Sequence, residues 1–344
     1  MKPHLNPGPV TATGSSHSPP HRRSRQGSRT GHSGQRRQRG AALLLALLTA
    51  ALAATLSASS YWQQWQAWQI ERSERQRVQS AWLLTGALDW ARLILREDAR
   101  ASQIDHLAEP WAVPLQESRL NTFLAAQEQN PEALLTESFL SGRIHDMQAR
   151  LNLRNLVEGS GEQMRLSPTG MASFAKLFQA LGLPQEELLQ FADRLQRTLQ
   201  ARPNATLLPQ HFDQLQWLGL SPSTLQRLAE HATWLPERTA LNLNTSGELA
   251  LYASVPGLER AQAQRLVQQR ERAHFTSLEQ AASAFGSAST HISAERFTLS
   301  SRYFLLQGQL RLDELTVQER SLVLREGINV RTVWRQRGGT SGQI

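Results

Sequence analysis

The residues most suited to binding a ligand lie in one stretch, residues 241–285. Pro256, Gly257 and Glu259 form a tight turn between two segments with helical spacing, which makes this a helix-hairpin-helix-like segment. With glycine at the position of Glu259, such a hairpin leaves backbone N–H groups open to a phosphate, whereas a carboxylate repels it. We therefore expect a structural role for the hairpin and no binding of nucleic acid, with a membrane-tethered DNA-binding or DNA-uptake protein as the alternative.

The sequence contains no recognisable catalytic constellation. The motifs HExxH, GxSxG, GxGxxG and the phosphate-binding loop are missing, and so is cysteine. The six histidines after residue 40 have no spacing typical of metal ligands. Acidic neighbours such as Glu186-Glu187 and Glu97-Asp98 point to different faces of a helix. We expect no catalytic residue, no metal and no cofactor, with a membrane-anchored enzyme as a second alternative.

The net charge of +8 comes from the first 40 residues. That segment holds eight of the 37 lysines and arginines and none of the 29 acidic residues, so the rest of the chain is balanced. A balanced body has no net field that attracts nucleic acid. Residues 1–40 are also rich in Pro, Gly, Ser, His and Arg, a composition that favours disorder.

An apolar run directly follows this basic segment. Residues 41–58 contain no charged residue and only three hydroxyl side chains, which suits a short membrane span. Because basic residues flank its N-terminal side, the positive-inside rule places residues 1–40 in the cytoplasm and the remainder outside. Trp62, Trp65 and Trp68 follow the run, as tryptophans do at a membrane surface. The alternatives are a buried core helix and packing of these tryptophans on a partner helix.

Helical spacing continues beyond the span to about Arg96. No proline interrupts residues 61–96, and apolar residues recur there every three or four positions. We expect this stripe to receive a globular domain and also to contribute to packing against partner helices. The stripe consists of Ala81, Leu84, Leu88, Ala91 and Leu95.

Strand signals flank a block of helical signals in the second half of the chain. Residues 138–156 end in strand-like alternation and predict a hairpin, whereas 302–337 alternates with turn signals near Asp313 and Gly327 and predicts three antiparallel strands. Between them, Ser-Pro starts and glycine stops mark successive helices. The expected fold is α+β, with a long N-terminal helix packed on an antiparallel sheet and an inserted all-α module.

The chain resembles the K-type minor pseudopilins of bacterial type II secretion systems, which are type IV pilin-like proteins. An ordered set of segments that spans nearly the whole chain supports this resemblance. The segments are QRGAALLLALL (38–48), GALDWARLILREDAR (86–100), LAEPWAVPL (107–115), ARLNLRNLV (149–157), LNLNTSGELALYASVPGLERAQAQRLVQQR (241–270) and SRYFLLQGQLRL (301–312). The resemblance implies that the α+β fold is pilin-like.

The resemblance also implies processing at Gly40. In this family a prepilin peptidase cleaves after the glycine on the cytoplasmic side and methylates the new amino terminus, so Ala41 would be the first mature residue. Most pilin-like subunits carry Glu at mature position five, which is Leu45 here, and the K-type proteins likewise lack it. A carboxylate in lipid is costly unless an amine pairs with it, and a subunit at a filament tip has no subunit ahead of it.

The same resemblance implies a position in the assembly, a cellular location and a set of partners. It implies a protein at the tip of the pseudopilus that initiates assembly and helps to export folded proteins across the outer membrane, since a bulky inserted module fits only at the end. The implied location is the inner membrane, with a single span and a periplasmic C-terminal domain. The implied partners are the I-, J- and H-type minor pseudopilins, the major pseudopilin, the prepilin peptidase and secreted substrates.

The inserted module differs from many family members in one respect. Residues 191–209 lack the acidic run that could bind calcium and offer only Asp193, so no calcium is expected there. The expected parts of the chain are a cleaved basic leader (1–40), the transmembrane part of the long helix (41–60), its periplasmic part (61–100), a pilin-like α/β domain (101–155 and 291–337), an inserted helical domain (156–290) and a flexible tail (338–344).

Overall fold

The computed structural model describes residues 35–119, 138–200, 208–312 and 315–338. The chain divides into two units, Met1–Ile70 and Glu71–Ile344. The predictions of a disordered leader and of a flexible tail fall mostly on residues 1–34 and 339–344, which lie outside the described residues. The proposed division into domains remains a prediction.

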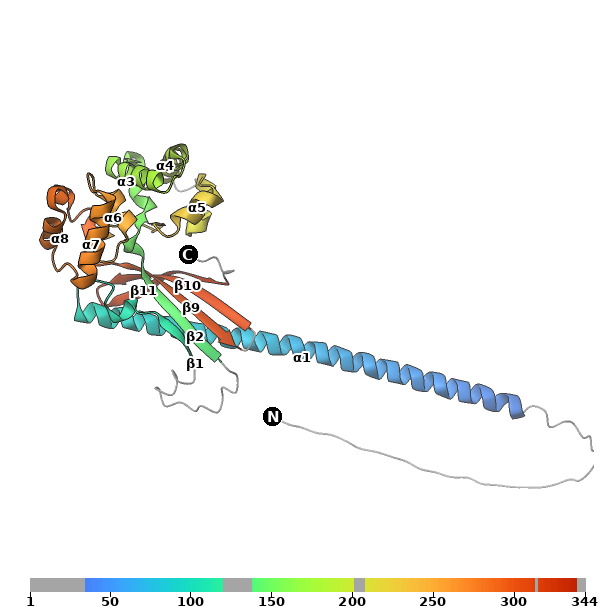
Figure 1. Cartoon of the computed structure of the whole chain (residues 1–344). Coiled ribbons are helices and arrows are strands. Elements are labelled where there is room, and N and C mark those ends of the chain that lie inside the picture. Colours follow the sequence, from blue (N-terminus) through green and yellow to red (C-terminus); the bar gives the residue numbers. More distant parts are fainter. Residues whose placement is uncertain (1–34, 120–137, 201–207, 313–314, 339–344) are drawn as a thin grey trace, which may run out of the picture. The chain divides into compact units, whose positions relative to one another are not determined.

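Helix α1 runs over Gln35–Ala101 and contributes to both units (Figure 1). It contains no proline, and it extends about five residues beyond the predicted helix at each end. Within the described residues, it is the helix that is long and apolar enough to cross a membrane by length and composition. In the first unit its side chains from residue 40 to 70 are exposed.

A five-stranded antiparallel sheet organises the second unit, with the strand order β1-β2-β9-β10-β11. The last part of α1 lies along one face of this sheet (Figure 1). The strands are β1 (Leu115–Arg119), β2 (Ser138–Asp146), β9 (Tyr303–Leu312), β10 (Leu315–Glu326) and β11 (Asn329–Arg337).

The stripe predicted on α1 packs against this sheet. Leu84 and Leu95 are fully buried and Leu88 is 2% exposed. Alternate residues of β9 meet the stripe, as the period of two in a strand requires, and these are Phe304, Leu306 and Leu310. The intervening Tyr303 and Leu305 pack with Leu235 on the opposite face.

Two glycines allow α1 to approach the sheet closely. Gly142 of β2 lies directly opposite Gly308 of β9. A Cβ atom added at Gly308 would lie 3.3 Å from Cδ2 of Leu84, and one added at Gly142 would lie 3.0 Å from the carbonyl oxygen of Gln307. The Leu84 side chain therefore packs close to the backbone of the sheet, where a larger residue than glycine would crowd it.

A mainly helical module is inserted between β2 and β9 (Figure 1). Its α-helices are α3 (Pro168–Ala180), α4 (Gln185–Gln200), α5 (Pro222–Leu228), α6 (Glu248–Ser254), α7 (Arg260–Arg272) and α8 (Leu278–Ala284). Three pairs of two-residue strands tie the connections together, namely β3 (Leu151–Asn152) with β6 (Ala232–Thr233), β4 (Val157–Glu158) with β5 (Arg165–Leu166), and β7 (Leu241–Asn242) with β8 (Phe297–Thr298).

Short 3-10 helices fill the remaining connections. One precedes the sheet, η1 (Pro110–Ala112), and the others belong to the insertion. These are η3 (Met147–Ala149), η4 (Leu153–Leu156), η5 (Gly161–Gln163), η6 (Phe212–Leu218) and η7 (Gly286–His291).

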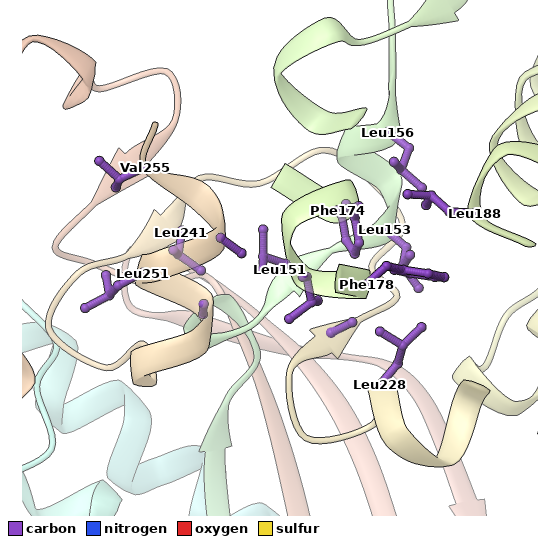
Figure 2. Packing of buried hydrophobic residues seen from close by; sticks show 14 of the residues in the cluster. Leu151, Leu153, Leu156, Phe174, Phe178, Leu188, Leu228, Leu241, Leu251 and Val255 are labelled. Carbon is purple, nitrogen blue, oxygen red and sulfur yellow. The ribbon is translucent and has the colours of Figure 1, made fainter. Parts of the chain in front are cut away.

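The module has its own hydrophobic core (Figure 2). Phe174 and Phe178 of α3 and Phe191 of α4 are fully buried in it. The caps predicted for α3 are confirmed, since Ser167 accepts a hydrogen bond from the Gly170 amide at the N-terminus and a glycine with positive φ follows the helix. The sequence pattern therefore located these helices correctly.

The hairpin predicted within residues 138–156 is wrong. Residues 138–146 form the single strand β2, which pairs with β1 on one side and β9 on the other. The alternation after Met147 instead belongs to η3, β3 and η4, whose Leu151, Leu153 and Leu156 enter the module core (Figure 2). The alternation of apolar and polar residues after Met147 predicted a second strand paired with the first. These residues do not pair with β2.

The three C-terminal strands are confirmed. β9, β10 and β11 pair in sequence, and the turn between the last two contains Gly327 with φ of 58°. The turn predicted near Asp313 lies outside the described residues.

Candidate functional site: an exposed helix, a buried polar junction and the hairpin

Helix α1 exposes a strongly apolar surface over residues 41–58, the predicted membrane span. Each leucine between residues 43 and 56 is more than half exposed, and these are Leu43, Leu44, Leu45, Leu47, Leu48, Leu52 and Leu56. The three hydroxyl groups in this stretch each donate to a backbone carbonyl three or four residues earlier. This surface has no polar group that needs water, so it suits a lipid environment.

The predicted processing residues lie on this helix. Gly40, Ala41 and Leu45 are exposed, and nothing lies within 4 Å of a Cβ placed on Gly40. The predicted roles of these three residues remain predictions. Trp62 and Trp65 follow the apolar run with their ring centroids 5.3 Å apart and are also exposed.

The apolar stripe on α1 was also predicted to bind partner subunits, but it is not accessible to them. Leu84, Leu88 and Leu95 are buried under the sheet of the same chain, so that part of the prediction is wrong. The opposite face of α1 within the second unit remains exposed, with Val78 at 54% and Trp82 at 73%. A partner helix therefore has to meet this second face.

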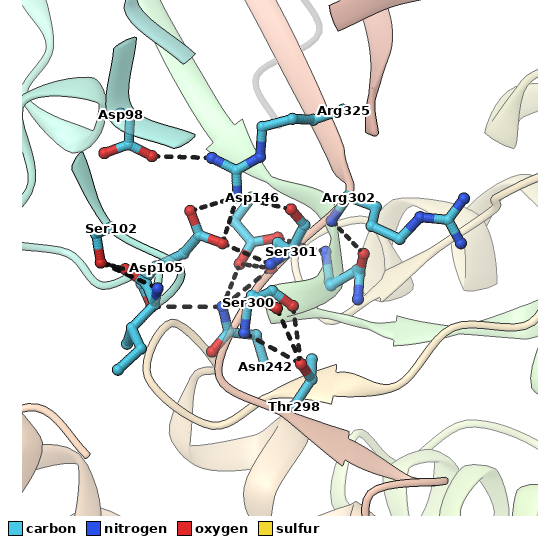
Figure 3. A network of polar contacts seen from close by, with 12 residues as sticks. Asp98, Ser102, Asp105, Asp146, Asn242, Thr298, Ser300, Ser301, Arg302 and Arg325 are labelled. Carbon is cyan, nitrogen blue, oxygen red and sulfur yellow. Dashed lines mark hydrogen bonds and ion pairs between the residues drawn. The ribbon is translucent and has the colours of Figure 1, made fainter. Parts of the chain in front are cut away.

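A buried polar junction joins the end of α1, the sheet and the inserted module (Figure 3). Arg325 of β10 donates to Asp98 of α1 at 2.8 Å. Its other terminal nitrogen donates to Asp105 at 2.5 and 2.6 Å and to the Ser301 carbonyl at 2.9 Å. Arg325 and Asp98 are each 8% exposed at the side chain and Asp105 is 2% exposed, so water does not screen these ion pairs.

Asp146 at the end of β2 extends the junction into the module. Its Oδ2 accepts hydrogen bonds from Thr245 at 2.5 Å, Ser301 at 2.6 Å and Asn242 at 3.2 Å. Its Oδ1 accepts from the Gln148 amide at 2.7 Å. Nearly every polar atom is satisfied, as a buried network requires. No local sequence pattern indicates this junction, because Asp98 and Arg325 are 227 residues apart in the chain.

Carboxylates outnumber cations at the junction. Burial and the charges of Glu109 and Asp105 together raise the pKa of Asp98 to about 7, while Arg325 opposes them. Burial also raises the pKa of Asp146 to about 6. The carboxylate oxygens of Asp98, Asp105 and Glu109 lie within 4.8 Å of one another, which is the donor type that a hard cation prefers. Arg325 already supplies the positive charge there.

Internal contacts occupy the hairpin of the helix-hairpin-helix-like segment, for which a structural role was predicted. Glu259 has an extended backbone with φ of −81°, so it causes no strain at the position where glycine was considered. Its amide donates to the Gln262 side chain at 3.0 Å, and the Leu258 amide donates to the Val255 carbonyl at 3.3 Å. Gly257 provides the positive φ of 71° that the turn after Pro256 needs. These amides are not available to a phosphate.

Lys176 of α3 stabilises this hairpin through hydrogen bonds. Its Nζ donates to the carbonyls of Val255 at 3.3 Å and Leu258 at 3.0 Å and lies 3.9 Å from the ring centroid of Tyr252. Two arginines of α7 also have internal partners: Arg260 pairs with Glu248 at 2.5 Å, and buried Arg270 donates to the Leu243 carbonyl at 2.6 Å. The hairpin is therefore part of the module's core structure.

The histidines pack as structural residues. His106 stacks on His274 with ring centroids 3.8 Å apart, and His145 bonds the Gln307 side chain at 3.0 Å. Burial lowers the pKa of both His106 and His145. His211 contacts Trp334 edge to face.

Comparisons with known proteins point to one family. Residues 241–299 match the model of type II secretion system protein K, a segment that includes the hairpin. The type II secretion system protein K of Pseudomonas aeruginosa is 25% identical over 265 residues, which cover 69% of this chain and 74% of the relative. A chain in the crystal structure of the GspK-GspI-GspJ complex from enterotoxigenic Escherichia coli shares the fold, with a TM-score of 0.62 and 18% identity.

That match covers 78% of this chain and 99% of the solved chain, which confirms the predicted pilin-like α+β fold. The resemblance recognised from the sequence is confirmed as well: the chain is similar to type II secretion system protein K.

Proposed function

We propose that this protein acts as a minor pseudopilin at the tip of the type II secretion pseudopilus, where it initiates assembly and assists the export of folded proteins. The observation that carries the proposal is a K-type fold attached to an apolar, exposed helix. The helix supplies an anchor and a surface for other subunits. The inserted module makes the subunit bulky, which favours an end position with no neighbour ahead of it.

The partners follow from the solved relative, which is described as a complex of GspK with GspI and GspJ. By analogy, this chain assembles with I- and J-type minor pseudopilins. The H-type minor pseudopilin, the major pseudopilin and secreted substrates remain further candidates, as the sequence predicted. The exposed face of α1 around Trp82 offers these subunits an apolar contact.

The location we propose is the inner membrane, with one span and the second unit in the periplasm. The apolar surface of α1 and the basic residues before it support this orientation. The prepilin peptidase would cut between Gly40 and Ala41 and retain the span.

Mass spectrometry of the protein purified from bacterial membranes tests this proposal. We expect a mature chain that begins with methylated Ala41, and we expect Gly40→Val to keep the basic leader while Ala42→Val is processed normally. A Gly40→Val chain with a normal mature terminus, or a wild-type chain that retains residues 1–40, would contradict the proposal.

A purely structural role is favoured over catalysis and over DNA binding. The histidines and the acidic junction are engaged in packing and hydrogen bonds within the described residues. The hairpin amides and arginines that could contact a phosphate backbone have internal partners.

A further inference from the structure

A crevice in the inserted module has an excess of positive charge. It has a volume of about 230 Å³ and lies beside the first turns of α3, among segments near residues 150–155, 238–241 and 295–297. Arg150, Arg238 and Arg296 line it, whereas Glu295 is the acidic residue among its described lining residues. Arg150 and Arg296 are partly buried, whereas Arg238 and Glu295 are exposed, so cations outnumber acids among the charged groups around the crevice.

None of these arginines forms an ion pair with a described carboxylate. Arg296 donates to the Ser254 carbonyl, and Arg150 donates to the Ala229 carbonyl at 2.8 Å, which leaves their positive charges uncompensated by contact. Glu158, which lies close enough to Arg238 to feel its charge, is bound by Arg165 at 2.9 Å. Backbone carbonyls therefore hold Arg150 and Arg296 near the crevice, while the charges of Glu230 and Asp146 act on Arg150 and that of Glu295 acts on Arg296.

Arg154 adds to this field from outside the crevice. Its Nη1 is buried without a hydrogen-bond partner. Burial lowers the pKa of Arg154, and the nearby charge of Arg238 lowers it further. Like charges that lie close together and remain unpaired are stabilised when an anion binds between or beside them.

A second observation places a hydroxyl donor at the same site. Ser173 of α3 lines the crevice and is 8% exposed. Thr169 and Gly170, in the first turn of the same helix, also line the crevice. The positive end of the helix dipole therefore adds to the charge of the arginines.

We propose that this crevice binds a small phosphate-bearing anion, which Arg238 and Arg296 contact through their guanidinium groups and Ser173 through its hydroxyl. A tetrahedral phosphate presents several acceptor oxygens, which matches donors that converge from three segments of chain. The acceptor positions of a carboxylate lie in one plane, so they match donors that converge from several directions less well. The phosphate group is either a free anion or part of a small organic molecule.

Calorimetry and thermal unfolding of the full-length protein in detergent test this site, with inorganic phosphate, glycerol 3-phosphate and succinate as separate probes. We expect a saturable rise in Tm with a phosphate probe. Arg238→Gln and Arg296→Gln should each weaken binding by about tenfold, since a charge-assisted hydrogen bond is lost. Ser173→Ala should weaken it less and leave the fold intact.

Arg197→Gln is the matched control, because the Arg197 side chain is 75% exposed and pairs with Asp193 of the same helix at 2.7 Å, away from the residues that line the crevice. It should bind phosphate like the wild type. Tighter binding of glycerol 3-phosphate than of inorganic phosphate would support an organic source, and the reverse order would support the free anion. The proposal is overturned if succinate binds as well as both phosphates, if no probe binds, or if the arginine and serine variants bind like the wild type.

Discussion

At the residue scale, Arg325 holds the second unit together. It is buried and joins Asp98 at the end of α1 to Asp105 in the following loop while lying on β10. A buried ion pair adds little to stability on balance, but removing one partner leaves an uncompensated charge. The same residue lies 4.7 Å from the ring centroid of Phe304, so it also packs on the core.

Arg325→Met should therefore destabilise the protein by about 3–5 kcal/mol, because Asp105 is left buried without a cation. Urea unfolding of the full-length protein in detergent, followed by tryptophan fluorescence, measures this change. Arg331→Met is the matched control, since Arg331 is 62% exposed at the side chain and pairs with Glu326 at 3.4 Å. Its effect should stay within about 1 kcal/mol. Equal effects of the two variants would refute the role of Arg325.

The stability of the second unit should depend on pH through Asp98 and Asp146. Burial raises the pKa of Asp98 to about 7 and that of Asp146 to about 6, above the ordinary value of 3.8. The folded state thus holds these protons more tightly than the unfolded state. Their contribution is complete below about pH 4 and is lost as pH rises through 6 and 7. The free energy of unfolding should fall between pH 5 and pH 8.

Unfolding measured across this range tests the prediction. The double variant Asp98→Asn with Asp146→Asn should flatten the profile, because an amide does not titrate and its oxygen still accepts hydrogen bonds. Asp193→Asn, which alters an exposed acid paired with Arg197, should leave the profile unchanged. A stability that rises from pH 5 to pH 8 in the wild type would show that other groups dominate.

At the element scale, α1 presents two different faces within the second unit. One is buried against the sheet through Leu84, Leu88 and Leu95, and the other exposes Val78 and Trp82. An exposed tryptophan on a helix is a common anchor of protein contacts. The helix is therefore both a core element and the candidate contact with other subunits.

Trp82→Ala should weaken co-purification of the I- and J-type minor pseudopilins without altering the fold, because Trp82 is 73% exposed. Affinity purification from cells that produce all three proteins measures the retained partners. Trp217→Ala, which removes a tryptophan that is 60% exposed on η6, is the matched control. Undiminished retention with Trp82→Ala would exclude this face as an essential contact.

Sequence patterns located most elements because each left a local signal. Helices α3 and α5 of the module start at Ser-Pro, a glycine with positive φ follows α3, and three strands near the C-terminus alternate clearly. Residues 138–156 were misassigned because β2 pairs with β9 across more than 150 residues of chain. The junction around Arg325 could not be predicted, since only the folded chain brings Asp98, Asp146 and Ser301 together.

At the scale of the whole molecule, the net positive charge comes from the start of the chain. Eight basic residues lie in residues 1–40, and the remainder carries equal numbers of basic and acidic residues. The mature protein should therefore have little attraction for a polyanion, because nonspecific binding of DNA depends on released counterions and hence on net positive charge.

A gel-shift assay at physiological salt should show no retardation of duplex DNA by the mature protein in detergent. The unprocessed chain, which keeps its arginine-rich leader, is the positive comparison and should bind weakly in a salt-dependent manner. Glu259→Gly should not create binding, because the hairpin amides keep their partners. Retardation by the mature wild-type protein would revive the DNA-uptake alternative.

The glycine of β9 beneath α1 bears on how a partner is received. Because Gly308 carries no side chain, Leu84 packs directly on the backbone of β9, and a Cβ atom at that position would lie 3.3 Å from its Cδ2. Alanine at Gly308 would require Leu84 to shift by a few tenths of an ångström. The contact of Leu84 with the sheet thus determines that the face of α1 with Trp82 is the one left for a partner.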